Sequence, residues 1–433
     1  MVQFVDVMGV TSAVVAIPSM IRAVHGSDAL AAPLATAYAM FFGGLLVLGA
    51  RLAQKFGHRR LLMAGLAVFA VAGVIGWAGN HGWQLVLARS VQGTASALTV
   101  PAALSLLLAT ASRADHRARA LGWWSAAGAA AGASGLFLGG YLTDTVGWRA
   151  VFWVNIPVAI LLGAGVIVWV RSQPETDRSS SIDVIGALLL TASVMAMVFG
   201  AALLQEPAHR MVGALAVAAG VLLAGLLFVR LARHREPIVP LSALRQPRLV
   251  ACSLGSFINT AVTSSTAVLL TLHLQEAAGQ SALQAGLMLL PLSVSVVVGS
   301  VLAGPVTHRW GNRQTIMLGL FLLALGNVVV ALTLDMVAGT VIGLALLGYG
   351  LGTSSVGCND LGTKVPREHV SMATGVLNTA AQLGTALGVA ALILVASSAE
   401  PAGGGRGPVI AILLAAAVAV VGLASIGRWR SAS

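Results

Sequence analysis

Two charged side chains, Asp6 and Arg89, stand inside long apolar stretches of the sequence. A charge in hydrocarbon costs about 2.5 kcal/mol or more on insertion scales, so each should face a partner or a polar cavity. A buried acid can carry a proton by alternating between its protonated and ionised forms, and an arginine within about 4–6 Å favours the ionised form. Asp6 and Arg89 are therefore candidate proton-coupling residues.

Each of these charges also has a plainer interpretation. At about 1.5 Å per residue, Asp6 is expected only about 8 Å inside the start of its span, where an acid can simply be hydrated. Arg89 is expected about 9 Å from the opposite end of its span, where a guanidinium can bond backbone carbonyls between helices. These depths leave a direct ion pair between the two residues in doubt. Gln92 shares the helical face of Arg89.

The composition is that of a membrane protein. Hydrophobic residues make up 58% of the 433-residue chain and charged residues 9%, which excludes an ordinary soluble domain. The unit of such a chain is the apolar run of about 20 residues that crosses about 30 Å of hydrocarbon. We predict an all-α polytopic membrane protein with about fourteen spans. They lie near 2–20, 33–51, 60–79, 83–108, 118–142, 150–170, 184–204, 211–230, 249–274, 284–304, 314–333, 337–357, 371–396 and 407–427.

Two longer connections, at 171–183 and 231–248, separate a middle pair of spans from the others. We therefore expect an N-terminal six-helix bundle over 1–170 and a C-terminal six-helix bundle over 249–433. Linkers and two extra transmembrane helices occupy 171–248. This division leaves six spans on either side of the middle pair.

Positive charge predicts the orientation of the chain. Most of the 25 Lys and Arg residues fall in loops and a tail on the side of the two termini, so both termini are expected in the cytoplasm. The net charge of +11 is thereby explained by topology. Nucleic-acid binding would need basic residues clustered with aromatic platforms, and the sequence shows neither.

A short basic loop joins two apolar runs in each half of the chain. The two copies share a glycine between two basic residues, and they consist of Lys55, Gly57 and Arg59 in the first half and Arg309, Gly311 and Arg313 in the second. Matched loops in an apolar chain indicate an internal duplication, which is typical of transporters.

Several motifs resemble those of major facilitator transporters. The loop 52–60 resembles their signature between spans two and three, and Arg89 with Gln92 and Gly93 resembles their fourth-span motif. The run 135–140 resembles their fifth-span antiporter motif. Segments 148–157 and 274–286 are similar to the fourteen-span drug:proton antiporter branch.

This resemblance covers nearly the whole chain. It implies two facing bundles around a central cavity. It also implies export of small hydrophobic or amphipathic compounds, such as drugs or antibiotics, in exchange for protons.

The chain also departs from the family pattern. Gln54 stands where the loop signature has an acid, and Leu136 stands where the antiporter motif has proline. The first-span acid of the branch falls at Gly9, one turn after Asp6. These departures leave an uptake symporter or facilitator for a small polar metabolite as the alternative function.

Glycines in the fifth span form one helical stripe, which includes Gly132, Gly135, Gly139 and, beside it, Gly140. Small residues allow close approach of helix backbones in lipid. Tight packing is the plain interpretation, and the family resemblance adds a seam that moves during alternating access.

Uncharged polar residues mark the C-terminal half. Asn259 and Thr263 lie in one span, and Asn378 and Gln382 lie four apart on one face of another. Facing inward, they would line a substrate cavity together with Gln92. Facing sideways, they would bond neighbouring helices. Near the inner boundary, Asp360 is expected to contact Lys364 or Arg367.

The remaining side chains indicate neither a metal site nor an enzyme. Cys252 and Cys358 lack metal-ligand spacing and are expected to be packing residues. The chain has no phosphate-binding glycine loop of the GxxxxGK[ST] kind, so a proton gradient rather than ATP is the expected energy source, with no cofactor. The expected partners are protons, a small-molecule substrate and the lipid bilayer. We expect a monomer in a bacterial inner membrane.

Overall fold

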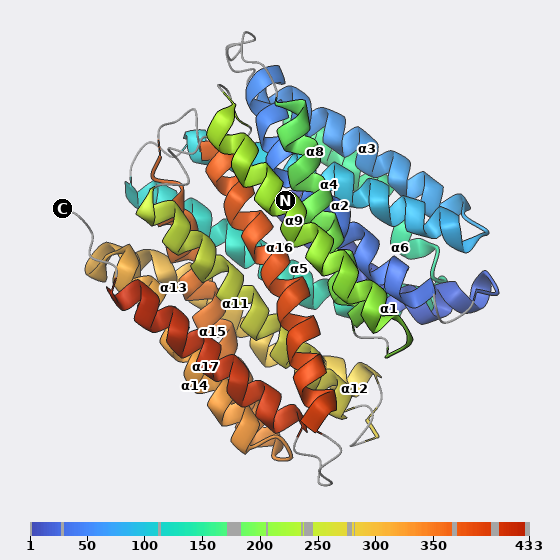
Figure 1. Ribbon diagram of the computed structural model, residues 1–433. Coiled ribbons are helices and arrows are strands. Elements are labelled where there is room, and N and C mark those ends of the chain that lie inside the picture. The colour runs from blue at the N-terminus through green and yellow to red at the C-terminus, as the bar shows by residue number, and fades with distance from the viewer. Residues whose placement is uncertain are drawn as a thin grey trace.

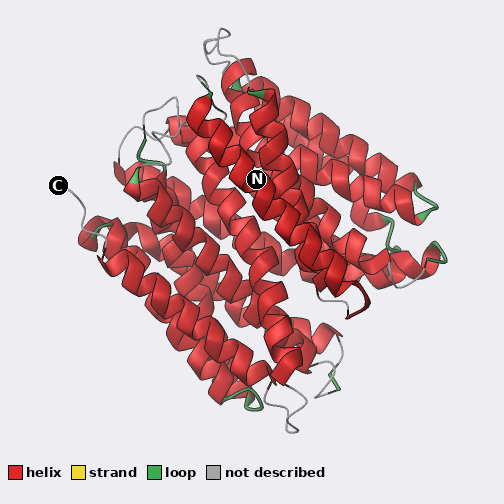
Figure 2. Cartoon of the chain, viewed as in Figure 1, coloured by secondary structure: helices red, strands yellow, loops and turns green. Residues whose placement is uncertain are grey.

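The computed structural model describes residues 2–26, 30–110, 114–170, 183–204, 207–234, 237, 246–274, 279–280, 282–365, 370–399 and 407–428. Within these ranges the regular structure is helical throughout (Figure 2). The all-α prediction is confirmed, and each expected span coincides with a helix or with two consecutive helices. Twelve of these segments are long and apolar enough to cross a membrane. The other two expected spans correspond to the first and fifth long helices.

The helices fall into three consecutive groups (Figure 1). The first half contains α1 (Val2–Ala23), α2 (Ala31–Phe56), α3 (His58–Ala78), α4 (Gly82–Thr110), α5 (Ala114–Thr145), α6 (Ala150–Trp153) and α7 (Asn155–Trp169). The middle group contains α8 (Val184–Leu204), the short 3₁₀ helix η2 (Pro207–His209) and α9 (Arg210–Arg233). The second half contains α11 (Pro247–Leu272), α12 (Ala282–Met288), α13 (Leu290–Trp310), α14 (Asn312–Leu332), α15 (Val337–Gly362), α16 (Val370–Ala399) and α17 (Gly407–Arg428).

The twin basic loops adopt the same structure in the two halves. Gly57 and Gly311 have φ angles of 91° and 83°, a region that glycine enters without steric cost. Two residues later, the Arg59 guanidinium donates to the Ile167 carbonyl near the end of α7, at 3.1 Å. Arg313 donates likewise to the Ile426 carbonyl near the end of α17, at 3.3 Å. Each arginine thus caps the C-terminal end of the last helix in its half.

A pair of glycines repeats the same packing in each half. Gly135 and Gly139 of α5 lie directly against α1, at Met8 and Ser12. Gly384 and Gly388 of α16 lie against α11, at Phe257 and Ala261. One constant displacement along the sequence relates all four contacts. The glycine stripe therefore brings α5 and α1 into backbone contact, and α16 and α11 form the corresponding pair.

The two halves meet along two seams, α2 against α16 and α5 against α13. An apolar cluster, which we call the inter-half seal, joins them towards the end of the molecule where Gly57 and Gly311 lie. The seal consists of Leu104, Leu108, Ala303 and Val356, with Trp124 and Val370 packed against it. Leu104 and Leu108 belong to the last turns of α4, and Val370 begins α16. The halves are therefore closed against each other at this end.

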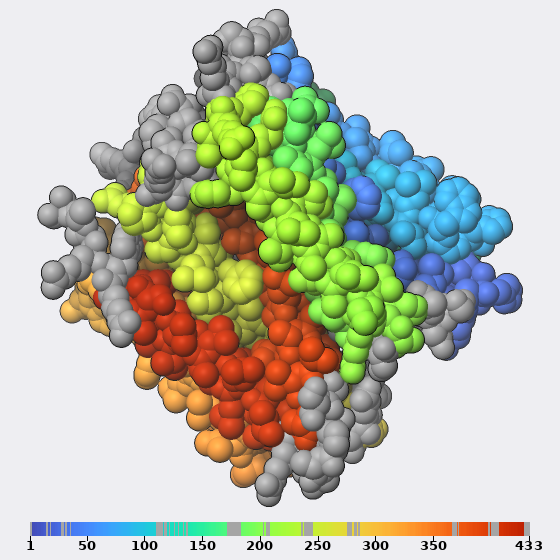
Figure 3. Space-filling model, viewed as in Figure 1, coloured from blue at the N-terminus to red at the C-terminus, as the bar shows by residue number. Residues whose placement is uncertain are grey.

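The middle helices lie over the α2–α16 seam. Helix α8 packs against both α2 and α16, and the Thr191 hydroxyl donates to the Gly44 carbonyl of α2 at 2.8 Å. Helix α9 packs on α8 and crosses the front of the molecule between the two halves (Figure 3). The pair is joined at one end by Asp183, whose carboxylate contacts Arg230 at 2.8 Å and accepts from the Gly186 N–H at 2.8 Å.

The close approach of α5 to α1 predicts that Gly135 and Gly132 tolerate alanine differently. A Cβ at Gly135 would fall 2.8 Å from the Met8 carbonyl oxygen, whereas a Cβ at Gly132 would fall 3.9 Å from the nearest Val7 methyl carbon. Gly135→Ala should destabilise the protein by about 1–3 kcal/mol through overpacking. Gly132→Ala should be neutral or slightly stabilising. Thermal unfolding in detergent measures both, and equal melting temperatures would contradict the close contact.

The ion pair that joins α8 to α9 predicts a pH-dependent stability. Burial by itself would raise the pKa of Asp183, but hydrogen bonds from Arg230 and Gly186 and the charges of Arg230 and His234 hold it below its usual value. A lowered native pKa contributes stability above about pH 4, which is lost as the pH falls through the native value. Arg230→Gln should therefore lower the melting temperature at pH 7, and its difference from wild type should shrink below about pH 4.

The matched control for the ion pair is Arg233→Gln, which alters an exposed arginine in the last turn of the same helix. It should leave the melting temperature near that of wild type. If both substitutions lower the melting temperature equally, the effect comes from general surface charge.

Candidate functional site

A cluster of buried polar residues occupies the interior of the first half. Asp6 comes from α1, Tyr38 from α2, and Arg89, Gln92 and Ser96 from one face of α4. Their exposed fractions are 6%, 5%, 2%, 1% and 0% in that order. Three helices therefore bring five polar side chains together away from solvent.

Asp6 is the centre of the cluster. Its Oδ1 atom accepts a hydrogen bond from the Tyr38 hydroxyl at 2.7 Å and another from the Ser96 hydroxyl. Ser96 is the central residue of α4, so Asp6 lies level with the middle of that helix. The expectation of a shallow, hydrated acid is wrong, because α1 begins part-way along α4 and the Asp6 side chain points into the bundle.

Arg89 and Asp6 both contact Tyr38. The guanidinium carbon lies 5.1 Å from the centroid of the Tyr38 ring, in the range of a cation–π contact. Nη1 donates to the Gln92 side chain at 3.1 Å, and Nε donates to the Leu34 carbonyl at 3.5 Å. Among the described atoms, Nη2 has no hydrogen-bond partner. Arg89 thus combines the two interpretations of the sequence, because it bonds one backbone carbonyl and also lies over the ring whose hydroxyl donates to Asp6.

The cluster has the chemistry of a site that exchanges a proton. Burial penalises an ionised carboxylate, whereas two hydroxyl donors and a nearby positive charge stabilise it. These opposing effects allow a buried acid to exist in both forms. Within the described residues the structure shows no group of three or more His, Cys, Asp or Glu side chains that could hold a metal ion.

The equivalent positions in the described part of the second half do not carry the charged cluster. The displacement that relates the α1 and α11 contacts places Gly255 at the position of Asp6. In α3 and α14, Gly65 packs on Thr99 of α4 as Gly319 packs on Ser354 of α15. The shift that carries Thr99 of α4 onto Ser354 of α15 places Leu344, Leu347 and Leu351 at the positions of Arg89, Gln92 and Ser96. At these mapped positions, the charged side chains of the duplicated fold belong to the first half.

The polar residues expected in the second half separate into two groups. Asn259 and Thr263 are buried inside that half, where the Asn259 side chain accepts from the Ser354 hydroxyl of α15 at 3.0 Å. Asn378 donates to the Thr374 carbonyl of its own helix at 3.0 Å. A Cβ at Gly43 of α2 would meet the Gln382 side chain at 3.2 Å. Of these four residues, Gln382 is the one that the described contacts place at the seam between the halves.

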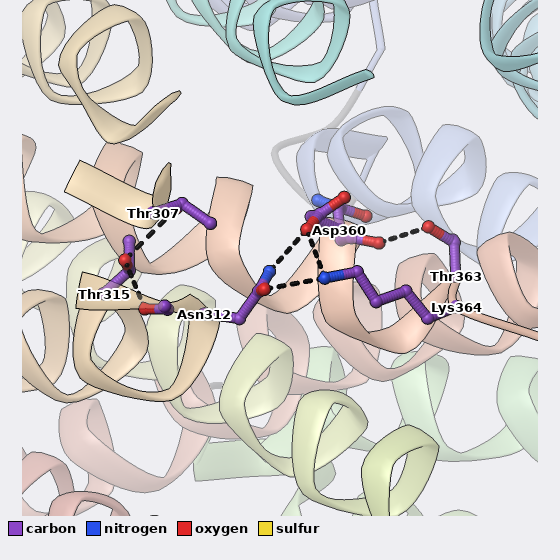
Figure 4. A network of polar contacts seen from close by, with 8 residues as sticks. Thr307, Asn312, Thr315, Asp360, Thr363 and Lys364 are labelled. Atoms are coloured by element: carbon purple, nitrogen blue, oxygen red, sulfur yellow. Dashed lines mark hydrogen bonds and ion pairs between the residues drawn. The ribbon is translucent and has the colours of Figure 1, made fainter. Parts of the chain in front are cut away.

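The second basic loop is held by a polar network (Figure 4). Asn312 donates to the Asp360 carboxylate at 2.6 Å and accepts from the Lys364 ammonium at 2.8 Å. Lys364 also pairs with Asp360 at 3.1 Å, which confirms the expected contact. In the basic loops themselves, Lys55 is half-buried and Arg309 is exposed. Gly140, which lies beside the glycine stripe of α5, is half-buried. Helix α15 therefore supplies an acid, Asp360, beside the second loop. Within that loop, His308 stands at the place that Gln54 holds in the first loop.

Sequence reasoning missed Tyr38 and Ser96. Ser96 follows Arg89 by two helical turns and shares its face, which is a periodic signal that could have been used. Tyr38 is one of only three tyrosines in the chain, and a hydroxyl in an apolar span needs a partner. Which partner it finds depends on how α2 packs on α1 and α4.

Comparison with known proteins identifies one family model and several relatives that match most of this chain. The family model described as Major Facilitator Superfamily matches residues 1–389 and 252–432. The tetracenomycin C resistance and export protein of Streptomyces glaucescens is 32% identical over 407 residues, which cover 91% of this chain and 74% of that protein. The lincomycin resistance protein of Streptomyces lincolnensis is 31% identical and covers 92% and 82% of the two chains.

Two further comparisons extend this result. The drug efflux pump JefA of Mycobacterium tuberculosis is 30% identical, with 90% of this chain and 77% of that protein covered. The crystal structure of the human organic anion transporter MFSD10 (TETRAN) superposes with a TM-score of 0.70 at 13% identity, over 98% of both chains. At that identity the likeness shows a common fold.

Proposed function

Because this chain belongs to the major facilitator superfamily, we propose that it exports small hydrophobic or amphipathic compounds, such as drugs or antibiotics, in exchange for protons. Relatives that are 30–32% identical include proteins of drug efflux, antibiotic export and antibiotic resistance. They support an efflux transporter of small molecules in a bacterial cell membrane. Proton exchange and the substrate class are the parts that we propose for this chain.

The observation that carries the proton-exchange proposal is the buried carboxylate of Asp6. Two hydroxyls and the charge of Arg89 stabilise its ionised form, and burial favours its protonated form. A change in access from one side of the membrane to the other can therefore load and unload a proton. Arg89 has the proposed role of favouring proton release, and Gln92 has the role of orienting Arg89.

Transport by alternating access fits the way in which the halves are joined. We assign the moving bundles to residues 1–170 and 249–433, with 171–248 between them. The excess of positive charge on the side of Gly57 and Gly311 assigns that end to the cytoplasm. The inter-half seal lies at the same end, which supports our proposal of a state closed towards the cytoplasm. Opening of the seal would expose the site to the cytoplasm.

The chemistry of the interior favours neutral or weakly ionised substrates. Asp6 and Arg89 are the charged groups of the buried cluster, and they largely compensate each other. Gln382 at the α2–α16 seam offers hydrogen bonds to a substrate between the halves. We assign the protein to the inner membrane as a monomer that works with protons and a small-molecule substrate.

Neutralisation of Asp6 tests the proton-exchange proposal. Asp6→Asn should abolish substrate accumulation driven by a pH gradient in everted vesicles, because an amide cannot exchange a proton. Substrate exchange without a gradient should continue. The matched control is Asp144→Asn, which changes an exposed acid at the end of α5 and should behave as wild type. Unchanged pH-driven accumulation in Asp6→Asn would remove Asp6 from the mechanism.

The direction and energy source can be tested with the unmodified protein. Expression in a host that lacks its own efflux pumps should confer resistance to members of a compound panel, and a proton uncoupler should abolish that resistance. Resistance that persists with the uncoupler would contradict proton antiport. Sensitisation to the same compounds would instead indicate uptake.

A further inference from the structure

Helix α2 is the element that touches both the Asp6 site and the second half of the molecule. Its Tyr38, Phe42 and Leu46 side chains lie one helical turn apart and pack in one cluster with Ala97 and Val100 of α4. The ring centroids of Tyr38 and Phe42 are 5.5 Å apart. One face of α2 is therefore built into the interior of the first half.

The other face of α2 lies on the second half and on the middle pair. The Thr379 hydroxyl of α16 donates to the Gly43 carbonyl at 3.3 Å, and Thr191 of α8 bonds the next carbonyl, that of Gly44. A Cβ at Gly375 of α16 would fall 3.2 Å from the Cα atom of Val47. Any displacement of α2 relative to α1 must therefore alter the contacts of α2 with α16 and α8.

The Tyr38–Asp6 hydrogen bond is a buried polar link between α2 and α1. Helix α1 packs chiefly on α5, and α2 packs chiefly on α4. The bond from the Tyr38 hydroxyl to Asp6 at 2.7 Å joins the two helices through their side chains. Arg89 stands over one face of the ring and Phe42 adjoins it, so the hydroxyl is held in one position.

The strength of this link depends on the charge of Asp6. A hydrogen bond to an ionised carboxylate is about twice as strong as one between neutral groups. Ionised Asp6 therefore holds α2 against α1, and protonated Asp6 holds it less firmly. The same proton that neutralises the acid also loosens the helix that contacts α16.

We propose that Tyr38 is the positioning residue that transmits the protonation state of Asp6 to α2, and through α2 to the seam with α16. This inference rests on the proposed proton exchange. It assigns to Tyr38 a role that differs from that of Ser96, although both hydroxyls donate to the same Oδ1 atom. Ser96 belongs to α4, which meets the second half through the apolar side chains of the inter-half seal. Tyr38 belongs to the helix that meets it through a hydrogen bond and glycine contacts.

The plain alternative is that Tyr38 fills the core and satisfies its hydroxyl. Tyr38→Phe separates the two roles, because it keeps the ring, the contact with Arg89 and the packing on Phe42 while it removes the hydroxyl. The full-length protein is reconstituted in liposomes for two assays with one transported dye. The first measures accumulation driven by an imposed pH gradient, and the second measures exchange of dye at equal pH.

We expect Tyr38→Phe to lower pH-driven accumulation about tenfold or more, the effect of losing one hydrogen bond to a charged group. Exchange at equal pH should remain near that of wild type. Ser96→Ala removes the other donor to the same oxygen, so it should also lower accumulation, but less than Tyr38→Phe does, because it leaves α2 tied to α1. Equal behaviour of the two variants would overturn the assignment to α2. A loss of exchange in Tyr38→Phe together with a lowered melting temperature would show a purely structural role and would also overturn it.

The far end of the proposed connection provides a second test. Thr379→Val removes the hydrogen bond to the Gly43 carbonyl and should reproduce the behaviour of Tyr38→Phe, with weak accumulation and normal exchange. The matched control is Thr374→Val in the same helix, since Thr374 bonds the Val370 carbonyl of α16 itself. It should behave as wild type. Equal effects of the two threonine variants would contradict transmission through α2.

Asp6→Asn in the same assays separates the inference from the proposed function. If Asp6→Asn accumulates dye as wild type does, proton exchange at Asp6 is wrong and the inference falls with it. If Asp6→Asn loses accumulation and Tyr38→Phe retains it, proton exchange stands and only the role of Tyr38 is overturned.

Discussion

A carboxylate in the interior of a membrane protein must have hydrogen-bond donors, and this requirement organises the first half of the molecule. Asp6 obtains its donors from two other helices, Tyr38 of α2 and Ser96 of α4. Arg89 adds a positive charge over one face of the Tyr38 ring, without a direct ion pair to Asp6. A direct ion pair would hold the acid ionised more firmly. In this arrangement Arg89 contacts the same tyrosine whose hydroxyl donates to Asp6.

The internal duplication gives the two halves one scaffold but different interiors. The glycine-capped loops, the arginines that cap α7 and α17, and the glycine contacts of α5 and α16 recur in both halves. At the level of the charged cluster, however, the second half has Gly255 and a set of leucines. Its own polar groups, such as Asn259 with Ser354, bond to each other between helices. Backbone geometry is therefore repeated, whereas among the described residues the cluster around Asp6 belongs to the first half.

The middle pair of helices extends the seam on one side. Helix α8 is tied to α2 by the Thr191 hydrogen bond and packs on α16 through apolar side chains. Gly43 and Gly44 of α2 place their carbonyls towards the two neighbours, Thr379 and Thr191. Small residues at this point allow three helices to approach closely. The junction thus connects the first half, the second half and the middle pair at one place on α2.

The sequence by itself determined the class of fold, because apolar runs of membrane length and their separation by short basic loops are local properties. It also identified Asp6 and Arg89, since a charge in an apolar run is visible without any structure. It could not identify Tyr38 and Ser96 as the partners of Asp6, because those residues lie on different helices and are brought together only by packing. The depth of Asp6 was predicted wrongly for the same reason, since counting residues from the start of α1 says nothing of where α1 lies against α4. Tertiary structure also decided that Asn259 faces the inside of its own half while Gln382 faces the seam, because helical periodicity shows which residues share a face and leaves open which neighbour that face meets.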